Sequence, residues 1–330
     1  MRLIFALATF LSSTPVFAQE QASFPELSFP LKCELGENCW IARYVDRAPG
    51  KERADYTCGD RSQHNHKGTD FTLANLGEMA KGVAVLAAAD GVVDVTRDGI
   101  KDEFANKSNY AEKTKVGLGN VVGIKHAGGM ISYYGHMKEG SILVKKGQQV
   151  KAGEKIGEVG LSGLTAYPHM HFALRQGNIW YDPFDKKPMQ AACSNGGSES
   201  AWSTNLAYRG LTLLPASFST EPLSSESQWQ TPLAQISKDS KLLFLNGRTF
   251  GTLKGDRWLM KITRPDGSIA KEYSTAIEKT QQHHRRYTGL RRPAGGFMPG
   301  IWTGEILIIR QAKDGTIEKF EDTVQVELVG

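Results

Sequence analysis

The sequence predicts an all-β protein built in two parts. Short apolar runs alternate with turn residues through most of the chain, and the recurrence of Gly147, Gly153 and Gly157 disfavours helices in that region. In the second half, the turn Pro265-Asp266-Gly267 joins two segments in which apolar and polar residues alternate, as they do in strands. The chain has 330 residues, more than one core usually holds, so we expect two domains.

The N-terminus has the pattern of an export signal. The basic Arg2 precedes an apolar run from Leu3 to Phe10, and Val16 and Ala18 occupy the −3 and −1 positions of a cleavage site. We expect residues 1–18 to be a signal peptide, because the run is short for a membrane anchor. Export across the inner membrane then favours the periplasm over the cell exterior, with no membrane attachment after cleavage.

The segments of the first half are predicted in chain order. Residues 19–54 form an extended lead-in, and Val83–Thr96 predicts a hairpin because an Asp-Gly pair separates two apolar runs. The polar segment Arg97–Gly119 predicts a long surface loop of the kind that often borders a binding site. Strands resume at Asn120, and residues 140–160 predict short, tightly turned strands.

The cysteines predict cross-links in the first half. Cys33, Cys39, Cys58 and Cys193 are an even number in an exported chain, so we expect two disulfides, with the pairing left open. The absence of a CxxC pair and the oxidising compartment disfavour a structural zinc site made from them.

The second half changes character after a polar stretch. Residues 194–210, which begin Ser-Asn-Gly-Gly-Ser, predict a linker, and the strand-like runs of 211–330 predict a β-sandwich of immunoglobulin-like type. No catalytic constellation is apparent in it. The basic cluster His283–Arg286, with Arg291 and Arg292 downstream, lacks interleaved aromatic residues, so we interpret it as a solvated strand face and expect no nucleic-acid partner.

Three short strings carry candidate metal ligands and catalytic groups. His66 and Asp70 form the pattern HxGxD, His169 and His171 form HxH, and His136 lies between them in the string YGHM. Strand alternation predicts that three strands each turn polar side chains to a groove and apolar ones to the core. The polar sets are Asp70 with Thr72, Ser132 with Tyr134 and His136, and His169 with His171.

Two imidazoles and one carboxylate leave one tetrahedral position of a zinc ion free for water, which is typical of a catalytic zinc site. The combination therefore points to metal-assisted hydrolysis. Taken singly, each histidine is more often a surface or hydrogen-bonded residue. His64 could stand in for His66, although the HxGxD match selects His66, and His126 is interpreted as a surface residue beside a Gly-Gly turn.

These strings resemble those of the lysostaphin-type, or LytM-like, zinc endopeptidases that cut peptidoglycan peptides. The run GLGNVVGIKH followed by YYGHM is similar to the family segment that ends in YxHL, and the Gly-rich run before PHMHFAL is similar to its approach to PHLHFE. The resemblance covers Asp55 to Pro183. It implies an antiparallel β-sheet peptidase domain with a groove, which we place at 55–193.

Carried over by position, the resemblance implies that His66, Asp70 and His171 bind one zinc ion per chain. It implies His136 and His169 as catalytic residues that transfer a proton and stabilise an oxyanion, without dividing these roles between them. The implied substrate is a peptidoglycan peptide.

The chain departs from the family pattern in places. Met137 and Met170 replace Leu, which we expect to be harmless. Tyr167 stands where the family has a small residue and Ala173 where it often has an acidic one, and both bear on substrate preference more than on activity. Further candidates for lining the groove or supporting ligands, each equally compatible with ordinary strand or turn structure, are Asn120, Tyr134, Ser162 and Thr165.

A zinc endopeptidase is the favoured function, and a non-catalytic LytM-like regulator of other cell-wall hydrolases is the alternative. Degenerate relatives usually lack ligands, whereas all five positions are filled here. The oligomeric state is left open.

Overall fold

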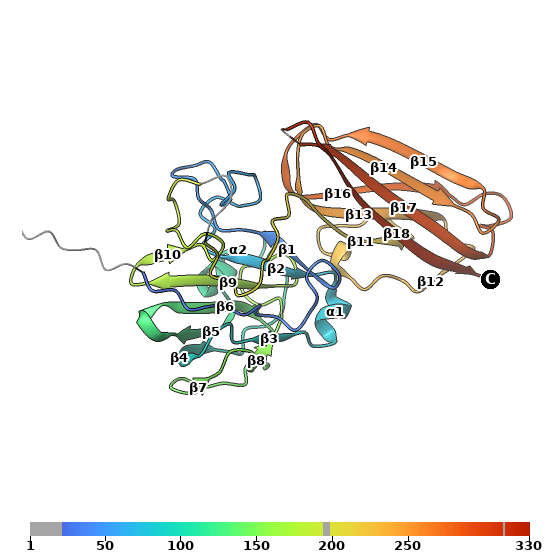
Figure 1. Ribbon diagram of the computed structural model, residues 1–330. Helices are drawn as coiled ribbons and strands as arrows, with labels where there is room; N and C mark the ends of the chain where they lie inside the picture. The colour runs from blue at the N-terminus through green and yellow to red at the C-terminus, as the bar shows by residue number, and fades with distance from the viewer. Residues whose placement is uncertain (1–21, 194–198, 313) are drawn as a thin grey trace, which may run out of the picture.

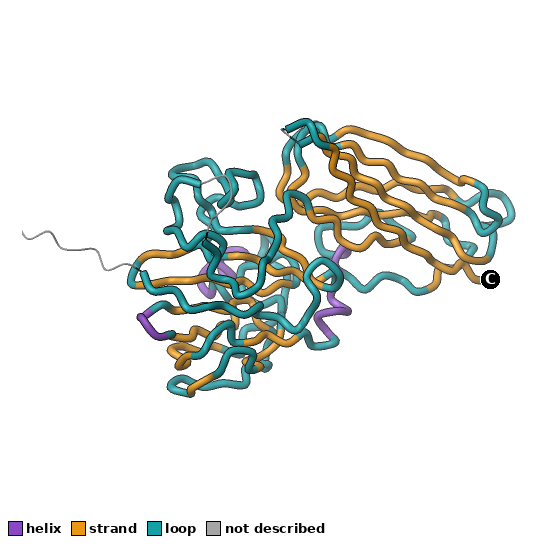
Figure 2. The backbone as a smooth tube through the Cα atoms, viewed as in Figure 1, coloured by secondary structure: helices purple, strands orange, loops and turns teal. Residues whose placement is uncertain are grey.

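The computed structural model describes residues 22–193, 199–312 and 314–330 of the chain. Two β-rich halves pack against each other, and helices are confined to short segments (Figures 1 and 2). This confirms the predicted all-β class. The predicted signal peptide, residues 1–18, lies outside the described residues, and within those residues no helix combines the length and apolarity needed to cross a bilayer.

The first half is built on one large antiparallel sheet. Its strands lie in the order β1-β2-β9-β6-β5-β4-β7, and β10 pairs with β9. Their bounds are β1 Cys39–Arg43, β2 Thr69–Leu73, β4 Gly91–Arg97, β5 Asn120–Lys125, β6 Ile131–Met137, β7 Gln149–Val150, β9 His169–Gln176 and β10 Ile179–Tyr181. A second small sheet pairs β3 (Ala84–Leu86) with β8 (Lys155–Glu158), and the short helices are α1 (Leu76–Ala80), α2 (Tyr110–Val116) and the 3₁₀ turn η1 (Ala127–Gly129).

The register of β2 against β9 sets the two faces of the main sheet. Phe71 and Phe172 are fully buried in the core on one face. Because successive side chains of a strand point to opposite faces, Asp70 and His171 lie on the other face. The pairing puts Asp70 directly opposite His171. The alternation predicted for these two strands is therefore present.

Two local predictions in this half are wrong. The segment Val83–Thr96 does not form a hairpin, since β3 pairs with β8 while β4 pairs with β5 and β7. The Asp-Gly pair turns the chain, but each strand finds its partner far away in sequence. The predicted loop Arg97–Gly119 contains helix α2, whose last turn is held because the Arg97 guanidinium donates to the carbonyl oxygens of Val116 and Gly119.

The predicted lead-in, 19–54, supplies the edge strand β1 of the main sheet. Four of its five residues are buried, so no alternating pattern marks it as a strand. The disulfide Cys33–Cys39 lies just before β1, and Cys58–Cys193 links the segment before β2 to the end of this half. The expectation of two disulfides is confirmed, and the structure fixes the pairing.

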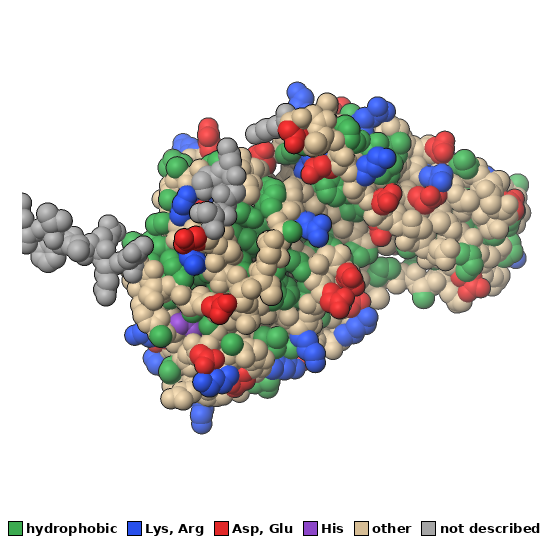
Figure 3. All heavy atoms as spheres, in the orientation of Figure 1, with side chains coloured by type: hydrophobic (Ala, Val, Ile, Leu, Met, Phe, Trp, Pro, Cys, Tyr) green, Lys and Arg blue, Asp and Glu red, His purple; other side chains and the backbone are tan. Residues whose placement is uncertain are grey.

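The second half is a β-sandwich, as predicted. One sheet has the order β11-β13-β16 and the other β12-β18-β17-β14-β15. The bounds are β11 Thr212–Ser219, β12 Gln235–Ser237, β13 Leu242–Thr252, β14 Arg257–Thr263, β15 Ile269–Ala276, β16 Gln281–Arg291, β17 Gly300–Gln311 and β18 Ile317–Val329, with the 3₁₀ turn η2 at Ser227–Trp229. Phe218 and Leu245 of the first sheet meet Trp258 and Ile306 of the second in one buried core. On the face shown in Figure 3, acidic and basic side chains are interspersed over both halves, in keeping with the small formal net charge of +5.

A third buried cluster, here called the interface cluster, joins the two halves. It consists of Trp40, Ala42, Ala74 and Tyr167 from the first half and Leu214, Trp229 and Phe250 from the second. The predicted linker, 194–210, includes residues 194–198 outside the described part of the chain. In its remainder, Ala201 and Trp202 are buried against the first core, so this stretch is packed onto the first half.

The interpretation of the basic cluster as a solvated strand face is wrong for His283. Its ring stacks on Trp229, with centroids 5.5 Å apart, and lies 5.1 Å from the ring of Phe250. His283 is half-buried against the interface cluster, whereas Arg285, two residues further along the same face of β16, is exposed. A sequence of consecutive polar residues did not reveal this, because the apolar partner comes from other strands.

Candidate metal centre

Three side chains predicted as ligands lie together on the face of the main sheet opposite the Phe71 and Phe172 core. The Asp70 Oδ1 atom is 3.1 Å from Nε2 of His66 and 2.8 Å from Nδ1 of His171. One donor atom from each of the three residues lies within 4.8 Å of the others, and these residues form the one such group found among the described residues. The set could therefore hold a metal ion.

The backbone at Gly68, within the HxGxD segment, lies very close to the His171 ring. A Cβ at residue 68 would lie 2.6 Å from Nε2 of His171, a distance that real Cβ atoms essentially never show. The absence of a side chain lets the chain before β2 pass next to the His171 ring. His66 then precedes the strand while Asp70 lies within it, and both face the same point.

The tautomer of His66 is set by the strand beside it. Its Nδ1 atom lies 2.8 Å from the carbonyl oxygen of Tyr44. A carbonyl oxygen only accepts, so Nδ1 carries the hydrogen and Nε2 keeps its lone pair towards Asp70. Tyr44 follows β1, a strand that the sequence did not reveal, so this support was not predicted.

His136 reaches the centre by a backbone irregularity. The strand prediction put Ser132, Tyr134 and His136 on one groove face, and this is wrong for the first two. Tyr134 pairs with Phe172 and is fully buried in the core, and its hydroxyl accepts from the Ala88 amide. Ser132 is buried on the same face as Tyr134.

A β-bulge explains how His136 leaves that face. Between Asn120 and Val122 the register with β6 shifts, and His136 has the left-handed φ of 56°. A bulge of this kind re-aims a side chain, and a left-handed conformation is uncommon for a residue other than Gly. The His136 ring consequently lies 4.7 Å from the His169 ring and 6.0 Å from the His171 ring, between centroids.

His169 is oriented by the chain segment that precedes it. Its Nδ1 atom lies 3.0 Å from the carbonyl oxygen of Tyr167 and 3.1 Å from Oγ1 of Thr165, so Nδ1 donates to the carbonyl. Its Nε2 atom lies 3.4 Å from Oδ1 of Asp70. The structure thus brings all five candidate site residues, His66, Asp70, His136, His169 and His171, into one cluster.

Comparison with known proteins identifies the family of this region. The family model described as peptidase family M23 matches residues 64–183. Residues 64–183 form a peptidase family M23 domain. All five clustered residues lie within this M23 domain.

Two relatives and one solved structure show what the M23 domain resembles. The chain is 30% identical over 144 residues to the peptidoglycan DD-endopeptidase ShyC of Vibrio cholerae, covering 44% of this chain and 28% of ShyC. It is 33% identical over 114 residues to the murein hydrolase activator NlpD of Escherichia coli, covering 34% of this chain and 24% of NlpD. A structure of a zinc containing peptidase from Vibrio cholerae shares 28% identity, with 42% of this chain and 39% of that chain covered, at a TM-score of 0.28. The chain therefore matches less than a third of the length of ShyC and of NlpD.

Burial and charge set the protonation states in the M23 domain. Burial alone would raise the pKa of Asp70, but the adjacent histidines His66, His169 and His171 hold that pKa well below its usual value. Burial lowers the pKa of His171, and burial together with His169 and His171 holds the pKa of His136 well below its usual value. An ionised carboxylate and neutral imidazoles are the forms that bind metal.

Tyr167 and Arg43 also touch Asp70, on its other oxygen. The Tyr167 hydroxyl donates to Oδ2 over 2.8 Å, and Nη1 of Arg43 lies 3.7 Å from the same atom. Burial raises the pKa of Tyr167 well above its usual value, so the hydroxyl keeps its proton. Sequence reasoning noticed Tyr167 only as a departure from the family pattern, and it missed Arg43 because no motif marks that residue.

The remaining predicted candidates of the M23 domain support the site or lie away from it. The carbonyl oxygen of Ser162 accepts from Nδ1 of His136 at 2.7 Å, and the Oγ atom of Ser162 accepts from the backbone N–H of Asn120. The His64 side chain is 57% exposed and outside the cluster. His126, interpreted as a surface residue, is instead buried between the carbonyl oxygen of Asp90 and Oγ of Ser132, and that prediction is wrong.

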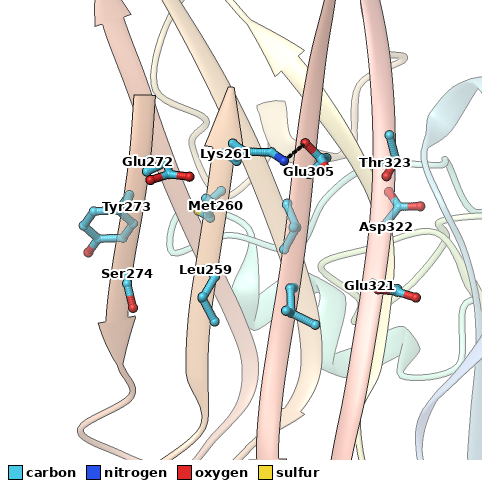
Figure 4. Close-up of a pocket in the computed structure, with 12 residues that line it drawn as sticks. Leu259, Met260, Lys261, Glu272, Tyr273, Ser274, Glu305, Glu321, Asp322 and Thr323 are labelled. Atoms are coloured by element: carbon cyan, nitrogen blue, oxygen red, sulfur yellow. Dashed lines mark ion pairs between the residues drawn. The ribbon is translucent and has the colours of Figure 1, made fainter. Parts of the chain in front are cut away.

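A pocket of about 710 Å³ lies far from this chemistry, on the outer face of the five-stranded sheet of the sandwich (Figure 4). Lys261 of β14 and Glu305 of β17 form an ion pair of 2.6 Å across it. No histidine or cysteine lines it. All the residues that line it belong to β14, β15, β17 and β18 of the sandwich, so the pocket lies outside the M23 domain.

Proposed function

We propose that this protein is an exported zinc endopeptidase that hydrolyses peptide bonds of bacterial peptidoglycan. The observation that carries the proposal is the contact of one carboxylate oxygen of Asp70 with both His66 and His171. Two further histidines, His136 and His169, stand beside this group, where a reacting peptide would be.

The donor set suits zinc. Imidazole nitrogens and a carboxylate oxygen are ligands that zinc accepts in tetrahedral sites, and three protein donors leave one position for water or substrate. Held by His66, Asp70 and His171, one zinc ion per chain would supply a Lewis acid that polarises a peptide carbonyl and acidifies water.

His169 and His136 are the proposed catalytic residues. Each donates its Nδ1 hydrogen to a backbone carbonyl oxygen, of Tyr167 and of Ser162 respectively. Nε2 of each ring is thereby left as the acceptor that can take a proton. The lowered pKa of His136 favours this neutral form, and either ring, once protonated, can donate to the leaving amine or to an oxyanion.

Peptidoglycan is the proposed substrate because the similar protein ShyC is named a peptidoglycan DD-endopeptidase. The periplasm is the proposed location, reached across the inner membrane with the signal at 1–18 and without membrane attachment afterwards. The two disulfides support an oxidising compartment of this kind.

A regulator of other cell-wall hydrolases is the second candidate. The similarity to the activator NlpD supports it, and so does the burial of the site, since His169 is 3% and His171 is 7% exposed. The complete set of five site residues favours the enzyme, because a regulator has no need of a metal centre with two adjacent proton-transfer groups.

Isolated sacculi distinguish the two functions. We expect purified mature protein to release peptides from the sacculi. This release should stop when a chelator removes the metal and should resume when zinc is restored. A matched control is His64→Ala, whose exposed side chain lies outside the site and whose loss leaves release unchanged. Absence of release from several wall types, together with stimulation of an added wall hydrolase, would contradict the enzyme and support the regulator.

A further inference from the structure

We infer that the C-terminal sandwich positions the Asp70 carboxylate through Tyr167, which contacts both. This inference rests on the proposed function, because it gives the sandwich a part in the same site. Tyr167 is here a positioning residue, and the sandwich is the support that fixes its ring. The connection runs from Trp229 and Phe250 through Tyr167 to Asp70.

On the site side, Tyr167 fixes the orientation of the carboxylate. Its hydroxyl donates to Oδ2 of Asp70 at 2.8 Å, while Oδ1 is the oxygen that faces His66 and His171. A carboxylate held through one oxygen cannot rotate freely, so the other oxygen stays in place as a ligand. The Tyr167 ring also stacks on His169, with centroids 4.4 Å apart and planes 25° apart.

On the other side, Tyr167 packs on aromatic residues of the sandwich. Its ring stacks on Trp229 at 5.5 Å and lies 5.3 Å from Phe250. Trp229 is 1% exposed and Phe250 is fully buried, so neither ring has room to move away while the halves stay packed. Tyr167 itself is 5% exposed, and its position is determined jointly by the two halves.

Arg248 of β13 connects the segment that carries Trp229 to the first half of the protein. Its guanidinium lies 5.0 Å from the Trp229 ring centroid, and its Nη1 donates to the carbonyl oxygens of Gln228 and Ala74. Gln228 belongs to the sandwich, whereas Ala74 directly follows β2, the strand that carries Asp70. The same arginine therefore ties the Trp229 segment to the strand of the proposed ligand.

Metal binding tests the inference without relying on hydrolysis. Tyr167→Phe keeps the aromatic stack and removes the hydroxyl. We expect it to weaken zinc binding about 10- to 100-fold, the usual effect of removing a partner of a ligand. We also expect it to change the visible spectrum of the Co²⁺-loaded protein, because the carboxylate geometry changes. The matched control is Tyr287→Phe, on an exposed tyrosine of β16, which should change neither.

The role of the sandwich is tested at Trp229. Trp229 contacts none of the proposed ligands, yet Trp229→Leu should shift the Co²⁺ spectrum in the same direction as Tyr167→Phe does. Trp229→Phe should have the wild-type spectrum, because an aromatic ring is kept. Phe250→Leu serves as a second variant if Trp229→Leu folds poorly.

Two results would overturn the inference. One is a Tyr167→Phe protein with wild-type zinc affinity and spectrum. The other is a wild-type Co²⁺ spectrum in the sandwich variants Trp229→Leu and Phe250→Leu. A protein that binds metal as described but never cuts wall peptides would refute the proposed function and leave this inference intact.

Discussion

Gly68 lies against the imidazole of His171, and a Cβ added there would be 2.6 Å from Nε2 and 2.8 Å from Cε1 of that ring. The nearest atom to that Cβ would be the backbone carbonyl oxygen of Phe172, so the glycine of HxGxD has a steric role: it makes room for strand β9, both for its backbone and for the proposed ligand His171. We predict that Gly68→Ala displaces the His171 ring and weakens zinc binding at least about 10-fold, because the ligand geometry is lost. Competition with a chromophoric chelator measures this.

A control for this variant is Gly210→Ala. A Cβ at residue 210 would meet its nearest neighbour, Nη1 of Arg310, at an ordinary 3.4 Å. Zinc affinity should be unchanged in this variant. Equal losses in both proteins would mean that the effect at residue 68 is a general loss of stability.

Substitution of a proposed ligand and substitution of a proposed proton-transfer group should have different effects on zinc binding. We predict that His171→Ala loses both bound zinc and hydrolysis, whereas His136→Ala retains zinc and loses about 100-fold or more in rate, the usual contribution of acid–base catalysis. The reason is that His136 lies beside the proposed ligand set and is not part of it. Metal analysis of the purified variants, alongside peptide release from sacculi, checks the separation. Zinc-free His136→Ala protein would make His136 a ligand.

The two disulfides should differ in their effect on stability. Cys58–Cys193 closes a sequence separation of 135 residues and Cys33–Cys39 one of only 6. Chain entropy then assigns about 5 kcal/mol to the long bridge and about 2 kcal/mol to the short one. We predict a larger loss in the free energy of unfolding for Cys58→Ser with Cys193→Ser than for Cys33→Ser with Cys39→Ser, measured in urea. The reverse order would show that local packing around β1 outweighs loop length.

Acid should weaken the contact between the two halves. Burial, followed by the charge of Arg248, lowers the pKa of His283 to about 3, below the value of 6.5 for an unperturbed histidine. The unfolded chain therefore binds more protons than the folded one between these values, so stability falls as the pH drops below about 6.5.

His283→Gln isolates this effect. The variant lacks the titrating ring, so its free energy of unfolding should fall less than that of the wild type between about pH 7 and about pH 5. A stability difference between the two proteins that stays constant over this range would mean that the His283 ring is not desolvated in the folded state.

Much of the candidate site could be predicted from local pattern. Strand alternation is a property of the backbone, and it correctly turned Asp70 and His171 to one face because β2 and β9 are regular. Alternation also keeps Ser132 and Tyr134 on one face, but the prediction assigned them the wrong face because it extended the alternation to His136. At His136 the left-handed backbone interrupts the alternation, and no residue type in the sequence YGHM indicates such a bulge.

Features that depend on distant partners could not be predicted. The strand β1 has no alternation because both of its faces are covered, and β3 and β4 pair with strands far away in sequence instead of with each other. Tyr167 was recognised as unusual, but its role depends on Trp229, which lies in the other half of the chain. Local composition contains no information on such contacts.

The interface cluster has a practical consequence for protein engineering. Trp40, Ala74 and Tyr167 are at most 8% exposed, and they pack in one cluster with Leu214, Trp229 and Phe250 of the sandwich. A recombinant fragment that ends before residue 211 would present this apolar surface to solvent and tend to aggregate. Grafting the M23 domain onto another protein thus requires either transfer of its C-terminal partner or replacement of the uncovered apolar side chains by polar ones.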